Sequence, residues 1–403
     1  MVALYIMFAS NYLKKNNRQA LLSSAPPESP GIIVVIPAYR ELEIINTLNS
    51  LNACYLPESR TEVIVVINHP ENEKEEIKDI NHTTKRQLDK WINARPPGGI
   101  SFYVIGPVDL PQKWAGAGLA RKTGMDEAVM RFNTFSNEKG IVVSLDADTL
   151  VEKNYLQSIE QHFRENSENV GVTIAFEHRT DGLSEKHRQG ILLYEKYLRY
   201  YKNAVAFTGY PYAMFTIGSA FAVTAEAYVK RGGMNRRKAG EDFYFLQNLA
   251  HIGQVGEINS TKVWPSARLS DRVPFGTGPA LIKWLNGTEN LNKTFHFDSF
   301  VALKSLFKLK ELFFQSDEKN YTALLEKLPK PVKHFLVADN FLEQLADLNC
   351  NCATPSTFQS RFFQKFNAFK ILKYLNFVHQ KYFQKGDLAD QVLLLEKESS
   401  RKS

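Results

Sequence analysis

The sequence is poor in cysteine. Three cysteines, Cys54, Cys350 and Cys352, occur in 403 residues, and an odd number with no regular spacing gives no disulfide framework. Cys350 and Cys352 also lack the second pair of ligands that a zinc site requires, and no histidine lies close to them in the sequence. The cysteine content therefore excludes a disulfide-stabilised small protein and favours reduced thiols in the cytoplasm.

The sequence also lacks a long apolar run. No stretch reaches the roughly 18 apolar residues that a membrane-spanning helix needs. The short apolar run at 2–9 has no basic residue before it, and Lys14 and Lys15 follow it, which reverses the order in a signal peptide. Residues 23–30 have a linker composition, rich in serine and proline. We expect residues 1–30 to form a helical arm and linker, and the protein to be cytoplasmic, either free or in peripheral contact with the inner face of the membrane.

A strong charge of one sign is missing as well. The 50 basic and 43 acidic residues leave a net charge of +7, and residues 300–403 hold 16 basic against 11 acidic residues. A local basic excess favours anionic partners such as phosphates or acidic lipids, but no RNA- or DNA-binding motif is present, so we expect no nucleic acid partner. Hydrophobic residues make up 44% and charged residues 23%, values typical of a soluble globular protein.

What the sequence does contain is an alternation of strands and helices. Apolar β-branched runs, typical of strands buried in a parallel sheet, alternate with segments of helical spacing, which predicts an α/β sheet with right-handed crossovers. Beyond about residue 300, leucine, phenylalanine and lysine recur at helical spacing and predict a helical appendage to about residue 398. The expected strands are 31–36, 62–67, 100–105, 141–145 and 170–176; the expected helices are 40–53, one ending near 93, 122–132, 154–166, 184–202 and one beginning near 240.

Two aspartates, Asp146 and Asp148, directly follow the expected strand at 141–145. In open α/β sheets, ligands bind at the carboxyl ends of strands, and two carboxylates there are costly to desolvate unless a cation or hydrogen-bond donors meet them. A hard divalent ion shared with substrate phosphates is the usual solution. The structural alternative is that Asp148 or Thr149 caps the following helix. We favour the ligand site, because a cap needs only one such residue.

Two further segments carry candidate site residues. Pro37 to Glu41 follow the first expected strand, where Tyr39 can stack on a base and Glu41 can accept a hydrogen bond from a base or ribose; alternatively, the proline only ends the strand. Glu241 and Asp242 open a helix. There the helix dipole alone favours acidic residues, or one carboxylate serves as general base for an attacking hydroxyl.

A loop bounded by glycine, at 266–278, contains Arg268 and Arg272. Two arginines four residues apart suit a closing lid that grips phosphates, and a solvated loop with an arginine–aspartate pair is the structural alternative. His251 and His296 are candidates for completing a metal site, although a structural role is the better interpretation of each.

The order and spacing of these motifs resemble glycosyltransferase family 2, inverting sugar transferases of the GT-A fold, over about residues 31–275. Asp146-Ala147-Asp148 is similar to the DxD motif of that family. Glu241-Asp242 is similar to its ED motif, and Pro37-Ala38-Tyr39-Arg40-Glu41 to its first nucleotide-contacting loop. Residues 116–121, which end in Arg121, resemble its glycine-and-arginine loop, and residues 218–233 resemble its acceptor-side segment.

The resemblance implies a mixed, Rossmann-like GT-A sheet over residues 31–298, with residues 299–403 as a C-terminal helical region. It implies transfer of a sugar from a nucleotide-diphospho-sugar to an acceptor hydroxyl, with Asp242 as base beside Glu241 and a divalent ion (Mn²⁺ or Mg²⁺) on Asp148 and Asp146. The residues implied in binding the donor are Pro37, Ala38, Tyr39, Glu41, Asn68, Arg121, Asp146, Ala147, Arg268 and Arg272.

The sequence departs from the family pattern at three points. Asn68 stands where many members carry an aspartate that reads the base, so the identity of the base stays open. Lys122 stands where an asparagine commonly follows the loop arginine. The QxxRW signature of processive members is absent, which favours addition of a single sugar.

The acceptor is not identified by any motif, and a lipid-linked or polysaccharide acceptor fits the resemblance. Residues 358–385 hold nine Phe or Tyr, six Lys or Arg and no acidic residue. They predict either a helix in peripheral contact with anionic lipid or, as we favour, a helix that packs its aromatic stripe on the catalytic domain with its lysines outward. The alternative to glycosyl transfer is a protein of nucleotidyltransferase type or one that only binds nucleotide sugars.

Overall fold

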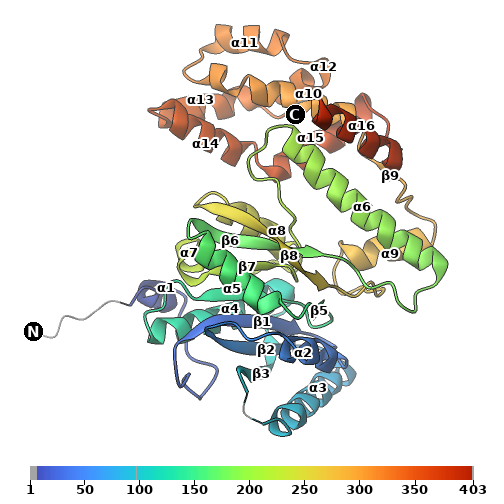
Figure 1. Cartoon of the computed structure of the whole chain (residues 1–403). Helices are drawn as coiled ribbons and strands as arrows, with labels where there is room; N and C mark the ends of the chain where they lie inside the picture. Colours follow the sequence, from blue (N-terminus) through green and yellow to red (C-terminus); the bar gives the residue numbers. More distant parts are fainter. Residues whose placement is uncertain (1–6, 97, 402–403) are drawn as a thin grey trace, which may run out of the picture. The chain divides into compact units, whose positions relative to one another are not determined.

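In a computed structural model, which describes residues 7–96 and 98–401, the chain forms two compact units (Figure 1). The first unit runs to Asp181 and resumes over Thr216–Gly276, and the second comprises Gly182–Phe215 and Thr277–Ser403. Most of the apolar run expected at 2–9 lies outside the described residues. Among the described residues, no helix is both long enough and apolar enough to cross a membrane.

The first unit is built on an eight-stranded sheet with strand order β3-β2-β1-β4-β7-β6-β8-β5. β1 to β4 pair in parallel, β7 is antiparallel to β4 and β6, and β8 is parallel to β6 and antiparallel to β5. The mixed α/β sheet predicted from the sequence is therefore confirmed. The strands are β1 (Pro30–Ala38), β2 (Arg60–Pro70), β3 (Ile100–Leu110), β4 (Ile141–Ser144), β5 (Leu150–Val151), β6 (Asn169–Phe176), β7 (Phe221–Thr224) and β8 (Gln254–Trp264).

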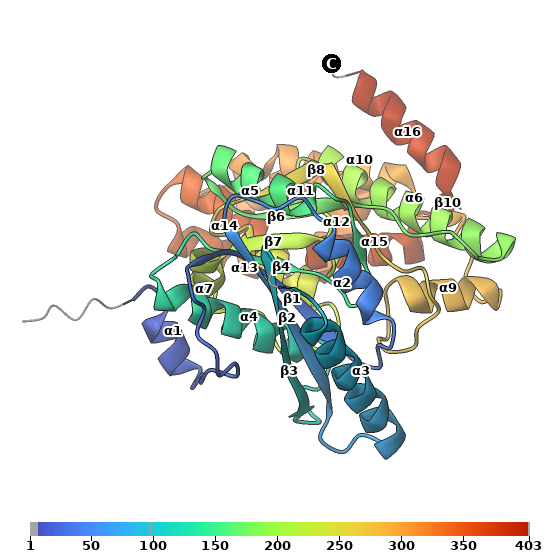
Figure 2. The same ribbon diagram turned by 60° about the horizontal axis from the view of Figure 1, so that its bottom comes forward.

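Helix α4 (Ala117–Thr134) packs on the parallel half of this sheet. A Cβ atom on Gly124 would lie 2.5 Å from Val35 and 2.8 Å from Val66, so glycine is what allows the helix to approach β1 and β2 this closely. Figure 2 shows α4 on one face of β1–β3 and α2 and α3 on the other. The remaining helices of the unit are α1 (Ser10–Lys15), α2 (Ile44–Asn52), α3 (Glu75–Asn93), α5 (Tyr155–Glu165), α7 (Ala225–Lys230) and α8 (Glu241–Leu249).

The expected strands and helices up to α8 form, with ends that differ by several residues. Strand β8 was not predicted. It buries only Ile258, Thr261 and Val263 among its eleven residues, because it lies near the edge of the sheet. Its polar, exposed positions hide the apolar pattern by which a strand is found in a sequence.

The second unit is a helical assembly. Its helices are α6 (Glu185–Phe207), α9 (Thr277–Leu285), α10 (Phe297–Lys308), α11 (Glu318–Glu326), α12 (Lys330–Ala338), α13 (Phe341–Asn351), α14 (Pro355–Lys365), α15 (Ala368–Lys381) and α16 (Leu388–Ser400). A 3₁₀ turn spans Lys310–Phe313, and the short strands β9 (Lys293–Thr294) and β10 (Gly386–Asp387) pair antiparallel. The helical region expected beyond residue 300 is present.

The two units divide the chain at other points than the boundaries predicted at 30/31 and 298/299. The arm belongs to the first unit, because Tyr12 of α1 is buried and its hydroxyl donates to Asp126 of α4 at 2.6 Å. α6 belongs to the second unit. The ring of Tyr200 packs edge-on against Phe300, and its hydroxyl donates to the Phe295 carbonyl at 2.8 Å. α6, which lies between the sheet strands β6 and β7 in the sequence, thus packs with the C-terminal helices.

The aromatic stripe of 358–385 packs within the second unit. Five of its rings are buried, those of Phe358, Phe362, Phe363, Phe366 and Tyr374. Phe362 alone contacts six other phenylalanines at centroid distances between 5.4 and 6.5 Å, on α10, the 3₁₀ turn, α13 and α14 and just beyond α14. We expected the stripe to pack on the catalytic domain, whereas these ring contacts join helices of the second unit. Contact with a membrane stays a prediction.

Candidate functional site

The predicted segments meet at the carboxyl ends of the parallel strands. In the β1–β4 ladder Val35 lies opposite Ser144, so Pro37 to Glu41 and Asp146 leave adjacent strands at the same edge. Ala38 and Ala147 are both buried, and the Ala147 carbonyl accepts a hydrogen bond from Thr47 Oγ1 at 2.9 Å. Pro37, Ala38 and Ala147 have no polar side-chain atoms, so only their backbone could contact a donor, and that contact stays a prediction.

Arg121 connects three of the predicted motifs. Its side chain is 4% exposed and donates from Nη2 to Asp146 Oδ1 at 2.7 Å and from Nε to Glu241 Oε1 at 3.1 Å. Nη1 donates to Ser144 Oγ at 2.7 Å and to the Gly218 carbonyl at 3.1 Å. Burial alone would lower the pKa of Arg121, but the carboxylates of Asp146 and Glu241 raise it above its ordinary value. Arg121 is thus a permanent cation that holds the two acidic motifs together.

Gly218 leaves space for this arrangement. A Cβ atom there would lie 2.4 Å from Nη2 of Arg121 and 3.5 Å from Oδ2 of Asp242. The guanidinium and the Asp242 carboxylate therefore both face the backbone at Gly218. This brings the acceptor-side segment expected at 218–233 to the same place as the DxD-like and ED-like motifs.

Asp242 has the electrostatic properties of a general base. Burial, reinforced by repulsion from Glu241, raises the pKa of Asp242 to about 7, although Arg121 and the Phe243 amide oppose the shift. That amide donates to Asp242 Oδ1 at 2.7 Å. A carboxylate whose pKa lies near neutrality can both accept and release a proton under physiological conditions.

The two arginines of the 266–278 loop bind the acidic edge of the sheet. Arg268 Nη2 lies 2.9 Å from Asp148 Oδ2, and Arg268 Nη1 donates to Glu41 Oε2 at 3.0 Å. Arg272 also pairs with Glu41, and its Nη2 donates to the Arg40 carbonyl at 2.8 Å. Glu41 is 2% exposed, so in this structure its carboxylate is turned to the loop arginines. Its predicted contact with the nucleotide stays a prediction.

Asp148 lies near charged side chains of both signs. Burial, with repulsion from Asp146 and Glu41, raises its pKa to about 6 in spite of Arg268. Among the described residues, no group of three histidine, cysteine or acidic side chains is arranged to hold a metal ion. Asp146 and Asp148 are hard oxygen ligands and fit a divalent ion only if a substrate supplies the remaining ligands.

Tyr39 and Asn68 are held by neighbours that the sequence did not indicate. The Tyr39 hydroxyl donates to Glu73 Oε2 at 2.6 Å, and burial together with that carboxylate raises the pKa of Tyr39 to about 12. Asn68 Nδ2 donates to the Ala38 and Val66 carbonyls at 3.0 and 3.3 Å. Asn81 in turn donates to the Asn68 carbonyl at 3.0 Å and accepts from the Arg40 amide at 3.0 Å. The side-chain amide nitrogen of Asn68 therefore forms hydrogen bonds to backbone carbonyls of β1 and β2.

Sequence reasoning missed Ser144, Asn81 and Glu73, whose residue types carry no motif and become visible only when their partners are placed. Among the described residues, neither of the two histidines considered as metal ligands belongs to a group of three histidine, cysteine or acidic side chains that could hold a metal ion. The side chain of His296 accepts from the Asp298 amide at 3.3 Å and caps α10 in the second unit, and burial lowers the pKa of His251.

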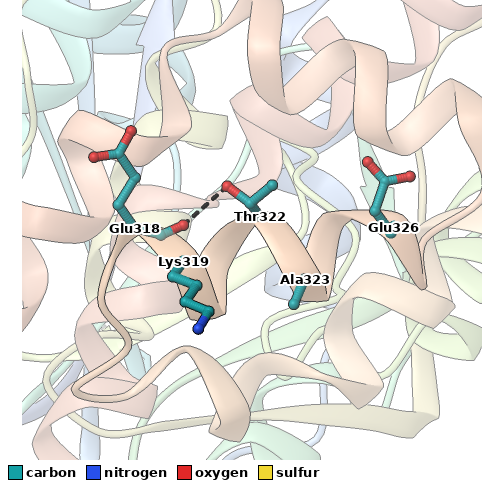
Figure 3. Close-up of a pocket in the computed structure, with 5 residues that line it drawn as sticks. All are labelled: Glu318, Lys319, Thr322, Ala323 and Glu326. Atoms are coloured by element: carbon teal, nitrogen blue, oxygen red, sulfur yellow. Dashed lines mark hydrogen bonds between the residues drawn. The ribbon is translucent and has the colours of Figure 1, made fainter.

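A hollow on the second unit contains none of the predicted residues. It is lined by Glu318, Lys319, Thr322, Ala323 and Glu326, all from α11 (Figure 3). The Thr322 hydroxyl donates back to the Glu318 carbonyl at 2.9 Å (Figure 3). One helix face without converging polar groups gives no basis for a site.

Comparison with known proteins agrees with the motifs. Residues 33–230, which include the DxD-like motif and Arg121, match the model of the family described as Glycosyl transferase family 2, so this part of the chain belongs to glycosyltransferase family 2 and the protein is a glycosyltransferase. No curated protein sequence matches the chain.

Several solved structures are similar to this chain over much of its length. TarS 1–349 of S. aureus in complex with UDP-GlcNAc is 12% identical, with 83% of this chain and 91% of that chain covered and a TM-score of 0.43. The mannosyltransferase PcManGT of Pyrobaculum calidifontis with GDP-Man and Mn²⁺ is 13% identical, with 85% and 92% covered and a TM-score of 0.39. Glucosyl-3-phosphoglycerate synthase of Mycobacterium tuberculosis, with Mn²⁺, UDP and phosphoglyceric acid, is 14% identical, with 64% and 78% covered and a TM-score of 0.36.

Proposed function

We propose that this protein transfers a single sugar, with inversion, from a nucleotide-diphospho-sugar to an acceptor hydroxyl. The observation that carries the proposal is the bridge by Arg121, which brings Asp146 on the strand side and Glu241 at the start of α8 to one guanidinium. Because Asp242 follows Glu241 directly, the bridge keeps the base close to the strand ends where the donor binds.

In the proposed reaction Asp242 accepts the proton of the acceptor hydroxyl. The acceptor oxygen forms a bond to the anomeric carbon on the face opposite the leaving group, and the bond from that carbon to the diphosphate oxygen breaks. The electron pair of that bond leaves with the nucleoside diphosphate, which carries the developing negative charge. A base with a pKa of about 7 is matched to this proton transfer, and Glu241 acts by positioning through Arg121.

The donor diphosphate is proposed to bind between the acidic edge and the loop arginines. Arg268 and Arg272 both contact this edge, and both are paired with carboxylates. When the diphosphate binds, its oxygens would replace these carboxylates, so that the two arginines always have an anionic partner. Tyr39, Glu41 and Asn68, at the ends of β1 and β2, are proposed to lie on the nucleoside side.

A divalent cation, Mn²⁺ or Mg²⁺, fits the acidic edge as a shared ion. The Asp148 carboxylate is buried near the carboxylates of Asp146 and Glu41, so an added positive charge would be favourable there. Asp148 and Asp146 would hold the ion, and its chemical contribution would be to neutralise the diphosphate charge. We propose further that the acceptor is lipid-linked or a polysaccharide and that the protein acts in the cytoplasm or at the inner face of the membrane.

The proposal is tested with nucleoside diphosphates and nucleotide sugars, each with and without Mn²⁺. One nucleotide is expected to raise the melting temperature, by an amount corresponding to about 2.7 kcal/mol at a ligand concentration 100 times its dissociation constant. The Asp148→Ala variant should lose the Mn²⁺-dependent part of this shift. If the wild type responds to no nucleotide, the proposal is wrong.

The role of the base is tested separately with Asp242→Asn, which should retain nucleotide binding and lose transfer by a factor of about 10² to 10⁴. Asp298→Asn is a matched control, because Asp298 occupies the same position at the start of α10 as Asp242 does at the start of α8. Equal transfer by Asp242→Asn and wild type would exclude Asp242 as the base.

A further inference from the structure

We propose that four basic side chains beside Asp242 form a subsite for a phosphate group on the acceptor. The cluster consists of Lys113, Arg236, Arg237 and Lys238, all exposed, and we call it the acceptor-side basic cluster. This inference rests on the proposed function and specifies the chemical class of the acceptor, a hydroxyl compound that carries a phosphate monoester or diester.

Two loops bring the cluster together. A Cβ atom on Gly116 would lie 3.0 Å from both Cα and O of Lys238, and one on Gly118 would lie 2.3 Å from the Arg237 carbonyl oxygen. Glycines at these two positions, at the N-cap and in the first turn of α4, therefore let the start of α4 contact the backbone of the loop before α8. The basic side chains of both loops are left to project into solvent.

Trp114 joins the basic groups of the two loops. Lys113 Nζ lies 5.2 Å from the centroid of the Trp114 ring, and Arg236 Cζ lies 5.3 Å from the same centroid. The ring itself is 37% exposed. A partly exposed indole beside two cations offers apolar surface to the carbon skeleton of a sugar or polyol, next to charges that can hold its phosphate.

The cluster lacks the acidic partners that other cations of this unit have. Arg121, Arg268 and Arg272 each pair with a carboxylate. Within the part of the chain that the structure describes, no carboxylate forms an ion pair with any of the four cluster side chains, whose like charges repel. An anion would relieve this repulsion, and the planar fork of arginine matches phosphate oxygens. Four positive charges suit a phosphate better than a single carboxylate.

The position of the cluster relative to the base gives it a role in the reaction. Asn235 Nδ2 donates to the Glu241 carbonyl at 2.8 Å, which ties the loop to the first turn of α8. Arg237 stacks on Tyr244, two residues beyond Asp242, with Cζ 3.6 Å from the ring centroid. A phosphate held by the cluster would therefore place a neighbouring hydroxyl of the same molecule near Asp242.

The test measures binding of phosphate probes to the full-length protein. Glycerol, glycerol 3-phosphate, a diglycerol phosphodiester and inorganic phosphate are titrated into wild type and the double variant Arg236→Gln/Lys238→Gln. Wild type should bind at least one phosphate ester tenfold more tightly than glycerol and more tightly than inorganic phosphate, and the double variant should lose at least tenfold in that affinity. The ester that binds more tightly identifies the acceptor as a monoester or a diester.

The matched control is Lys90→Gln/Lys139→Gln, which removes the same charge from exposed lysines on α3 and before β4. It should change the affinity for the phosphate ester less than twofold. Both double variants should melt as the wild type does, since their side chains are exposed.

Three outcomes would overturn the inference. In the first, the wild type binds no phosphate ester more tightly than it binds glycerol. In the second, both double variants lose the same affinity for the ester. In the third, the cluster variant loses as much affinity for nucleoside diphosphate as it loses for the ester. The last outcome would assign the cluster to the donor and leave the proposed function intact. Failure of the proposed function is recognised independently, by a wild type that responds to no nucleotide or by unchanged transfer in Asp242→Asn.

Discussion

Both units bury aromatic rings, but they differ in the contacts that connect their elements. The first unit places charged pairs in its interior, among them Arg121 with Glu241 and Arg131 with Glu62, each with side chains no more than 5% exposed. The second unit places phenylalanine and tyrosine rings there, and Phe362 at its centre is fully buried. Aromatic packing stabilises a fold directly, whereas a buried ion pair is weak evidence for stability because desolvation offsets the attraction.

One helix of the first unit carries two buried arginines that differ in the elements they contact. Arg121 and Arg131 both belong to α4, and both are held by acidic residues. Only Arg121 contacts the predicted motifs. Burial of charge is therefore no marker of function by itself; what distinguishes Arg121 is that its partners lie on different elements that converge at one edge of the sheet.

Replacement of Arg121 is expected to have the largest effect. Arg121→Met leaves Asp146 and Glu241 buried without their cation, which should destabilise the protein by about 3–5 kcal/mol and abolish detectable nucleotide binding and transfer. Arg131→Met, the control on the same helix, should lose similar stability and retain nucleotide affinity in the folded fraction. Denaturant unfolding and nucleotide titration measure the two effects, and loss of nucleotide affinity in both variants would remove the distinction between the two arginines.

Replacement of Phe362 examines the aromatic unit. Phe362→Ala removes a ring that packs against several neighbours and should cost about 3–5 kcal/mol of unfolding free energy. Nucleotide affinity should change less than twofold, because the predicted donor residues all lie in the first unit. Calorimetric unfolding and nucleotide titration measure the two effects. A large loss of nucleotide affinity in a fully folded Phe362→Ala variant would show that donor binding also depends on the second unit.

The raised pKa of Asp242 should make the protein less stable as the pH rises. The pKa of Asp242 in the folded protein, about 7, is above its ordinary value near 4. The folded state therefore retains a proton that the unfolded state releases, and stability falls as the pH rises between these values. Asp242→Asn should consequently be more stable than wild type at pH 8, by about 1–2 kcal/mol, with a smaller difference at pH 5. Transfer by wild type should rise with pH and level off above about 7. A stability difference independent of pH would contradict the shift.

The loop arginine should have a smaller effect that is confined to the ligand. Arg272→Gln removes one charge-assisted contact to the diphosphate and should weaken nucleoside diphosphate binding about tenfold. Lys373→Gln, in the second unit, removes an exposed lysine paired with Asp339 and should leave binding unchanged. Titration of both variants with the nucleotide that stabilises the wild type decides this, and equal affinity of Arg272→Gln and wild type would refute the lid.

The sequence predicted the parallel strands and their order along the chain because buried strands carry continuous β-branched runs, as in 31–36 and 62–67. It also predicted that Asp146, Asp148, Glu241 and Asp242 belong together through their resemblance to a family. It did not predict β8, since a strand near the sheet edge exposes most of its residues. Nor did it predict that α6 would pack with the C-terminal helices, because helical spacing does not specify which partner an apolar face will meet.

The sequence by itself determined the class of fold, the family and which acidic residues are proposed to carry the chemistry, because these depend on local patterns of residue type. Only the tertiary structure decided that Arg121 joins Asp146 to Glu241 and that Glu41 faces Arg268 and Arg272. It also decided that the basic residues of two distant loops share one surface beside Asp242. The physical reason is that charge interactions depend on distance in space and on burial, and neither quantity can be read from separation along the chain.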